Sequence, residues 1–181
     1  MFNLMTQSEQ ISAAIPEQQL SIIRDQLGRE PRGIVEVAVS TAKGVPLVLK
    51  MRSLVADQPF PTLYWLCSKD LSKAIGQIEG QGWVKAIEER LQHDDDLRAA
   101  YLQDQQLYVA QRWQAMHSDD KSRIEALKLS HLFDQYGIGG LTQWDKVRCL
   151  HMQYAQHLVD GNCIGAIMDE SFGLNTLTIN R

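Results

Sequence analysis

A short run near the C-terminal end of the chain, KVRCLHMQYAQH at residues 146–157, brings together side chains that could do chemistry. Cys149 and His151 are the candidates for catalysis, the cysteine as a nucleophile and the histidine as an acid–base group with an ordinary pKa of about 6.5. A nucleophilic cysteine needs a lowered thiol pKa, which nearby cations or a helix N-terminus can provide. Lys146 and Arg148 flank this cysteine in the sequence.

The residues before this run predict a helix that covers all of it. Residues 142–145, TQWD, have the form of a capping box. At about 100° per residue, one face of the helix contains Val147, Leu150, His151, Tyr154, Ala155 and Leu158. Cys149 then lies about 200° from His151 around the helix axis, nearly opposite. His151 and Tyr154 can therefore also be interpreted as core residues with hydrogen-bonded polar tips.

The same spacing argues against a metal site. A metal ion shared by Cys149 and His151 would require residues 146–149 to be extended and the helix to start later. His151 and His157 lack the i, i+4 spacing of a helical zinc pair, and the chain has no C-x-x-C pair. We therefore predict no metal and no cofactor.

A second set of candidate residues lies in the turn REPRG. Arg29 and Arg32 flank Pro31 between two glycines, and two guanidinium groups on one turn could bind a phosphate or a carboxylate. The alternative is an exposed turn whose arginines form salt bridges.

Composition limits the classes of function. The chain has 181 residues, a net charge of -4 and a pI near 5.7, which give no overall attraction to nucleic acid or anionic lipid. We expect no secretory signal, since residues 1–15 contain no Lys or Arg and no sustained apolar run. No stretch approaches the roughly 18 apolar residues of a membrane span. Three scattered cysteines do not suggest a disulfide framework, so we expect a cytoplasmic protein with reduced thiols.

The elements that must position these residues follow from periodicity. We expect a frayed segment over residues 1–15 and one α+β domain over residues 16–181. Its small three-stranded N-terminal antiparallel sheet would pack against a mostly helical C-terminal part. The expected elements before Ser68 are a helix at 16–27, strands at 34–40 and 45–50, a loop at 53–61 and a strand at 62–67. Further helices are expected to start at Ser68, near residue 83, at Asp94 or Asp95, and at Ser118, the last of these running to Gly137 before a loop at 137–141.

Several segments together resemble the bacterial family catalogued as domain of unknown function 501. They are LGREPRG at 27–33, GVPLVL at 44–49, PFPTLYWLC at 59–67, IEGQGW at 78–83, KVRCLHMQYAQHL at 146–158 and GNCIG at 161–165. The resemblance spans roughly residues 24–172 and implies no activity. The resemblance implies two departures of this chain from the family pattern. Members commonly carry the cysteine-containing pattern R-C-x-C-G where this chain has STAKG at 40–44, and a proline often stands at the position of Cys163. A metal bound by such cysteines elsewhere in the family would have no counterpart here.

The resemblance groups three segments, the REPRG turn, the PFPT loop and the KVRCLH run. It implies that their polar residues converge on one concave site: Arg29, Arg32, Thr62, Lys146, Arg148 and His151. Four cations near a helix N-terminus would favour a small anionic ligand such as a phosphate, a nucleotide or a carboxylate.

A protein-interaction module without catalytic activity is the alternative. Tyr101, Tyr108 and Trp113 would then form an exposed aromatic patch for a protein partner. The acidic pI argues against a nucleic-acid partner, as does the helical core spacing of the aromatic residues. The residues alone do not decide whether the protein is an enzyme.

Overall fold

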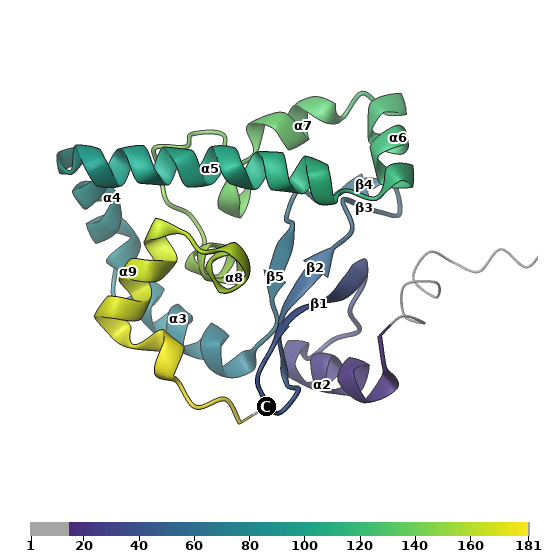
Figure 1. The fold of residues 1–181 in the computed structure, drawn as a ribbon, viewed down its shortest axis with the longest axis horizontal. Helices are drawn as coiled ribbons and strands as arrows, with labels where there is room; N and C mark the ends of the chain where they lie inside the picture. The colour runs from purple at the N-terminus through teal and green to yellow at the C-terminus, as the bar shows by residue number, and fades with distance from the viewer. Residues whose placement is uncertain (1–14, 181) are drawn as a thin grey trace, which may run out of the picture.

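The computed structural model describes residues 15–180 (Figure 1). The segment predicted to be frayed therefore lies outside the described residues except for Ile15, which is buried. The predicted α+β class is confirmed, since a three-stranded antiparallel sheet precedes a mostly helical part. The helices are α2 (Glu17–Leu27), α3 (Lys69–Gly80), α4 (Trp83–His93), α5 (Asp95–Ala115), α6 (Ser118–Ala126), α7 (Ser130–Gln135), α8 (Leu150–Asp160) and α9 (Cys163–Phe172), with 3-10 turns η1 (Ile138–Gly140) and η2 (Leu174–Thr176).

The sheet has the order β1-β2-β5, and both strand pairs are antiparallel. Its strands are β1 (Ile34–Ser40), β2 (Pro46–Met51) and β5 (Tyr64–Leu66). The predicted hairpin joins β1 to β2, and Gly44 in its turn has a φ of 79°, which glycine adopts without strain. Val37 lies opposite Leu49 across the first pair, and Val48 lies opposite Leu66 across the second.

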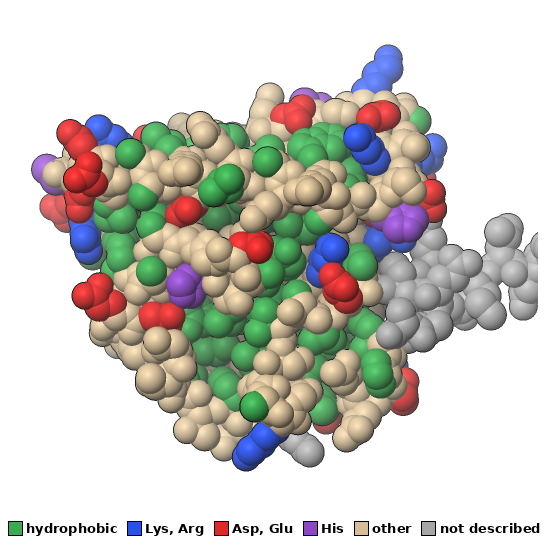
Figure 2. All heavy atoms as spheres, in the orientation of Figure 1, with side chains coloured by type: hydrophobic (Ala, Val, Ile, Leu, Met, Phe, Trp, Pro, Cys, Tyr) green, Lys and Arg blue, Asp and Glu red, His purple; other side chains and the backbone are tan. Residues whose placement is uncertain are grey.

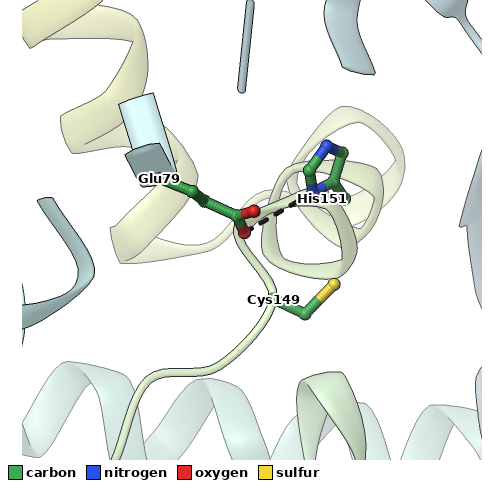
Figure 3. Close-up of side chains that lie close together, drawn as sticks. All are labelled: Glu79, Cys149 and His151. Atoms are coloured by element: carbon green, nitrogen blue, oxygen red, sulfur yellow. Dashed lines mark ion pairs between the residues drawn. The ribbon is translucent and has the colours of Figure 1, made fainter. Parts of the chain in front are cut away.

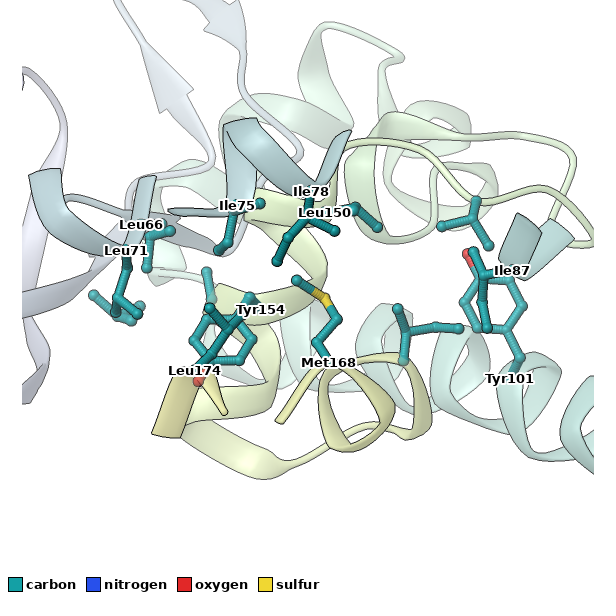
Figure 4. Packing of buried hydrophobic residues seen from close by; sticks show 14 of the residues in the cluster. Leu66, Leu71, Ile75, Ile78, Ile87, Tyr101, Leu150, Tyr154, Met168 and Leu174 are labelled. Carbon is teal, nitrogen blue, oxygen red and sulfur yellow. The ribbon is translucent and has the colours of Figure 1, made fainter. Parts of the chain in front are cut away.

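Helices cover both faces of this sheet (Figure 1). On one face α2 buries a small apolar cluster, which contains Ile15, Leu20, Ile23, Ile34, Leu49 and Cys67. On the other face α3, α8 and α9 pack with α4 and α5 over the larger core (Figure 4). The residues of this core include Val48, Leu66, Leu71, Ile75, Ile78, Ile87, Tyr101, Leu150, Tyr154 and Met168. The sheet therefore separates two apolar compartments.

Local signals placed several helix ends correctly. Gly28 ends α2 with a φ of 65°, in the left-handed conformation that favours glycine. The Ser68 hydroxyl accepts a hydrogen bond from the Leu71 amide and begins α3. The Asp94 carboxylate does the same for the Leu97 amide at the start of α5.

Two predicted segments differ from the structure. The loop expected at residues 53–61 contains a two-stranded hairpin, β3 (Leu54–Val55) and β4 (Gln58–Pro59). Ala56 and Asp57 at its turn both have positive φ, as the tight turns of two-residue hairpins require. The helix expected from Ser118 to Gly137 is two helices, because Lys128 has a φ of 58° and interrupts the helical backbone between α6 and α7. The loop expected at residues 137–141 contains the turn η1.

Among residues 15–180, no helix combines the length and the apolar character needed to cross a bilayer. Figure 2 shows apolar side chains in the middle of one face, while acidic and basic side chains lie mostly toward its rim.

Candidate functional site

The segment before α8 is not helical, so the predicted helix through residues 146–149 is wrong. α8 begins at Leu150, and Cys149 before it has a φ of 54° and a ψ of 80°. Side chains from two other helices, α4 and α5, hold this segment in place. The Tyr101 hydroxyl donates to the Lys146 carbonyl at 2.8 Å, and the Val147 amide donates to Glu88 at 2.9 Å. These distant contacts outweigh the local capping-box signal.

The end of this segment also approaches η1 very closely. A Cβ atom on Gly139 would lie 2.5 Å from the Arg148 carbonyl oxygen, and Gly139 has a φ of 76°. Only glycine fits both the backbone conformation and the short separation. Gly139 therefore permits the path of the chain that brings Cys149 to the start of α8.

Because the helix starts late, Cys149 and His151 lie on the same side of the chain rather than opposite each other. Their side chains lie close to that of Glu79 of α3, and the His151 ring faces its carboxylate (Figure 3). One ligand atom of each of these three residues lies within 4.8 Å of the other two. The Glu79 Oε1 atom is 3.5 Å from His151 Nδ1, and the His151 and Glu79 side chains are 25% and 30% exposed. The cluster is thus partly desolvated but reachable from solvent.

The remaining hydrogen bonds of the cluster fix its orientation. His151 Nε2 lies 3.1 Å from the Ser72 carbonyl oxygen, and the Leu150 amide donates to Glu79 Oε1 at 2.7 Å. The pKa of His151 is raised above its usual value, first by a hydrogen bond with the Cys149 side chain. The Ser72 carbonyl and the charge of Glu79 raise this pKa further, whereas burial lowers it.

A separate pocket lies between α2 and the sheet. The REPRG turn and the PFPT loop, two of the three segments predicted to meet, both line it. Its volume is about 150 Å³, and its walls are Leu27, Arg29, Pro31, Arg32, Ile34, Leu49, Met51, Val55, Phe60 and Trp65. The Arg29 guanidinium lies 5.8 Å from the ring centre of Trp65, and the Phe60 ring is 5.7 Å from it. The pocket is therefore mainly apolar, with two cations in its wall.

The six residues predicted to converge do not share one site. Arg29 and Arg32 line the pocket on the α2 face of the sheet, whereas His151 belongs to α8 on the opposite face. Lys146 and Arg148 lie in the segment before α8, and Arg148 is exposed. Thr62 is half-buried and precedes Leu63, whose amide donates to the Tyr108 hydroxyl. The sheet itself separates the two ends of the expected site.

The predicted aromatic patch for a protein partner is also wrong. Tyr101 and Tyr108 are 0% and 3% exposed, and Trp113 is half-buried against Phe133. Their polar tips bind protein groups rather than solvent, with Trp113 donating to Asp134 at 2.9 Å. The helical spacing of these residues therefore marks core positions.

The sequence interpretation missed Glu79, Phe60 and Trp65. Glu79 is 70 positions before Cys149, and no local pattern of α3 distinguishes it from any other acidic side chain on a helix. Phe60 and Trp65 stand in the segment PFPTLYWLC, where their aromatic character was the available signal.

Comparison of the chain with curated proteins and with solved structures finds no match. The model of one protein family does match, over residues 37–170, and its description is "Protein of unknown function (DUF501)". The matched range contains β2, β5 and the whole Glu79–Cys149–His151 cluster, and it excludes the REPRG turn. Since the match covers most of the chain and contains five of the six segments quoted above, the protein belongs to the DUF501 family.

Proposed function

We propose that the protein binds a small ligand that joins an anionic group to a compact apolar body. The binding site is the pocket between α2 and the sheet, defined by Arg29, Arg32, Phe60 and Trp65. This keeps the anionic ligand expected from the sequence but restricts its site to the REPRG turn and the PFPT loop.

The observation that carries the proposal is the charge at the pocket wall. Neither Arg29 nor Arg32 forms an ion pair with a residue that the structure describes, and Glu30 between them pairs instead with Arg24 at 2.8 Å. Two guanidinium groups without a carboxylate partner beside an apolar cavity favour a phosphate or carboxylate group from outside.

The size and lining of the cavity indicate the rest of the ligand. A volume of about 150 Å³ is that of a cavity that holds one benzene-sized ring. Phe60 and Trp65 offer aromatic surface, and Ile34 and Leu49 offer aliphatic surface. A single-ring or branched-chain carboxylate or phosphate monoester therefore fits better than a whole nucleotide, only part of which could enter.

The proposal places the protein in the cytoplasm. Cys67, Cys149 and Cys163 are all free thiols, which a reducing compartment maintains.

Isothermal titration calorimetry with aromatic and branched-chain carboxylates and phosphate esters tests the proposal, with the matching uncharged amides and alcohols measured beside them. We expect the charged compounds alone to bind, and Arg29→Met and Arg32→Met each to weaken binding at least about tenfold, the loss of one charge-assisted hydrogen bond. Arg98→Met is the matched control, because Arg98 is exposed on α5 and pairs with Asp95. Equal binding of the uncharged analogues, or an equal loss in the control, would contradict the proposal.

A further inference from the structure

We propose that Glu79, Cys149 and His151 form a mononuclear site for a divalent transition metal, with zinc as the metal that their chemistry fits best. The site lies on the opposite face of the sheet from the ligand pocket, and it does not depend on the proposed function.

The first argument is that three electron-pair donors face one another. A carbonyl oxygen can only accept a hydrogen bond, so the contact with Ser72 places the His151 proton on Nε2. In the neutral ring, Nδ1 then carries a lone pair, and it faces a carboxylate oxygen of Glu79 at 3.5 Å. When the ring is neutral and the cysteine is a thiolate, none of the three groups can donate to another, and the Cys149 sulfur adds a third atom with a lone pair. No Lys or Arg that the structure describes pairs with Glu79, so a cation between the three atoms would satisfy all of them.

The second argument is the spacing of these atoms. A tetrahedral zinc ion with bonds of about 2.0–2.1 Å to nitrogen and oxygen holds those two ligand atoms about 3.3 Å apart. The observed separation of Nδ1 and Oε1 is 3.5 Å, and all three ligand atoms lie within 4.8 Å of one another. Small side-chain rotations would therefore complete the coordination.

The third argument is the type and charge of the ligands. One thiolate, one imidazole and one carboxylate suit a borderline-soft ion such as zinc better than calcium or magnesium, which prefer oxygen. A dipositive ion with two anionic ligands leaves the site neutral. Three protein ligands leave a fourth position for water or a substrate, as in catalytic zinc sites, and the partial exposure of Glu79 and His151 keeps that position accessible.

The surrounding hydrogen bonds are those that support metal ligands. A ligating histidine usually donates its other ring N–H to a carbonyl or carboxylate, as His151 does to Ser72. The ligating carboxylate is itself fixed, because Glu79 Oε1 accepts from the Leu150 amide. The bond between Leu150 and Glu79 also gives an acceptor to a free backbone amide at the N-terminus of α8. It does not explain why His151 Nδ1 faces Glu79 or why the Cys149 sulfur lies beside them.

Metal titration with site variants tests the proposal. Chelator-treated protein is titrated with Zn²⁺ against a chromophoric chelator, and its Co²⁺ form is examined for a thiolate-to-metal charge-transfer band. The variants are Cys149→Ser and Glu79→Gln, with Cys163→Ser as the matched control, since Cys163 is a half-buried thiol outside the cluster. Glu79→Gln keeps an oxygen for the Leu150 amide and so separates loss of a ligand from loss of the helix start.

We expect one equivalent of Zn²⁺ in the wild-type protein and in Cys163→Ser. Affinity should fall at least about 100-fold in Cys149→Ser and in Glu79→Gln, because even outer-shell changes cost 10–100-fold. The charge-transfer band should be absent from Cys149→Ser. Circular dichroism tests whether each variant is folded. If Cys149→Ser does not fold, the Zn²⁺ affinity of Glu79→Gln alone tests the metal site. No stoichiometric binding, or equal affinity in Glu79→Gln and the wild type, would overturn the metal site.

Discussion

The two ends of α8 each carry a histidine, and the partners of these histidines differ in kind. At the C-terminal end, His157 Nδ1 accepts from the Asn162 amide at 3.2 Å, and Nε2 lies 3.0 Å from an oxygen of Asp169. The other oxygen of Asp169 accepts from the Tyr154 hydroxyl at 2.7 Å. Every donor in this network meets an acceptor, and the network joins α8 to α9.

At the N-terminal end, the partners do not match in this way. One nitrogen of His151 has the Ser72 carbonyl as its acceptor, but the other, which carries a lone pair in the neutral ring, faces a carboxylate of Glu79 and the sulfur of Cys149 (Figure 3). The comparison indicates that a histidine with complementary partners on both nitrogens supports the fold, whereas one among further electron-pair donors has a place for a cation. Both histidines stand on one helix, so residue type alone does not separate them.

A glycine lies against each end of α8. A Cβ on Gly165 would be 2.2 Å from the His157 Cβ and Cγ atoms, and one on Gly139 would be 2.5 Å from the Arg148 carbonyl oxygen. At the C-terminal end the glycine makes room for a side chain, and at the N-terminal end for the backbone that carries Cys149.

The largest expected effect is a difference in thiol reactivity between Cys149, at the N-terminal end of α8, and the two other cysteines, Cys163 and Cys67. Burial, followed by a hydrogen bond to Asp104, raises the pKa of Cys163, and burial raises the pKa of Cys67 to about 12. At pH 8 the thiolate of Cys67 should be on the order of 1,000-fold rarer than that of an ordinary thiol with a pKa of about 8.5. We therefore expect iodoacetamide to alkylate Cys149 first.

Mass spectrometry of tryptic peptides measures this order. Labelling of Cys67 and Cys163 should increase as the pH rises, because the thiolate fraction of a group with a raised pKa grows with pH. Zn²⁺ should protect Cys149 alone, and unfolded protein should label at all three positions at similar rates. Faster labelling of Cys163 than of Cys149 would contradict the comparison.

A methyl group beneath His157 should have the next largest effect. Gly165→Ala places a Cβ inside the His157 side chain, and such overpacking should lower the free energy of unfolding by about 3 kcal/mol. Urea denaturation measures the change. Gly76→Ala in α3 is the control, because its Cβ would meet nothing within 4 Å, and it should raise stability by up to about 1 kcal/mol. Equal stability of the two variants would mean that the C-terminal end of α8 is not closely packed.

Replacing Asp169 and Glu79 in turn should distinguish a carboxylate that supports the fold from one that binds metal. The expected changes in the free energy of unfolding are smaller than that of Gly165→Ala. Asp169→Ala leaves the buried Tyr154 hydroxyl and His157 without an acceptor and should lower the free energy of unfolding by about 2 kcal/mol. Glu79→Gln keeps the bond to Leu150 and should change it by less than about 0.5 kcal/mol in metal-free protein. Thermal and urea unfolding of both variants, with and without Zn²⁺, measures the difference. The comparison fails if Asp169→Ala abolishes the zinc-dependent stabilisation while Glu79→Gln retains it.

The parts of the fold that follow from short-range signals were predicted from the sequence. Strand periodicity located β1 and β2, and capping residues located the start of α3 and of α5. The start of α8 was missed because the same kind of local signal, the capping box at residues 142–145, is overridden by contacts with Tyr101, Glu88 and Glu79. Those residues lie 45, 59 and 71 positions away from the groups that they bind.

The candidate sites show the same contrast between short-range sequence signals and long-range contacts. Cys149, His151, Arg29 and Arg32 were identified by residue type and spacing. The sequence did not predict that these residues belong to two separate sites. The sheet lies between the REPRG turn and α8, and this placement depends on the tertiary fold. The error in the helix start also led to the prediction of no metal, since it placed Cys149 and His151 on opposite sides of one helix.

The hydrogen bond between Glu79 and the Leu150 amide spans 71 positions, and so it closes a large loop of chain. The loop contains α4, α5, α6, α7 and η1, and both of its ends meet at the proposed metal site. An ion bound there would act as a cross-link, and closing a loop of this length removes about 4 kcal/mol of chain entropy from the unfolded state. The loop is therefore a unit whose ends stay together when its interior is cut. A single nick at Lys128, between α6 and α7, would leave two fragments that remain associated.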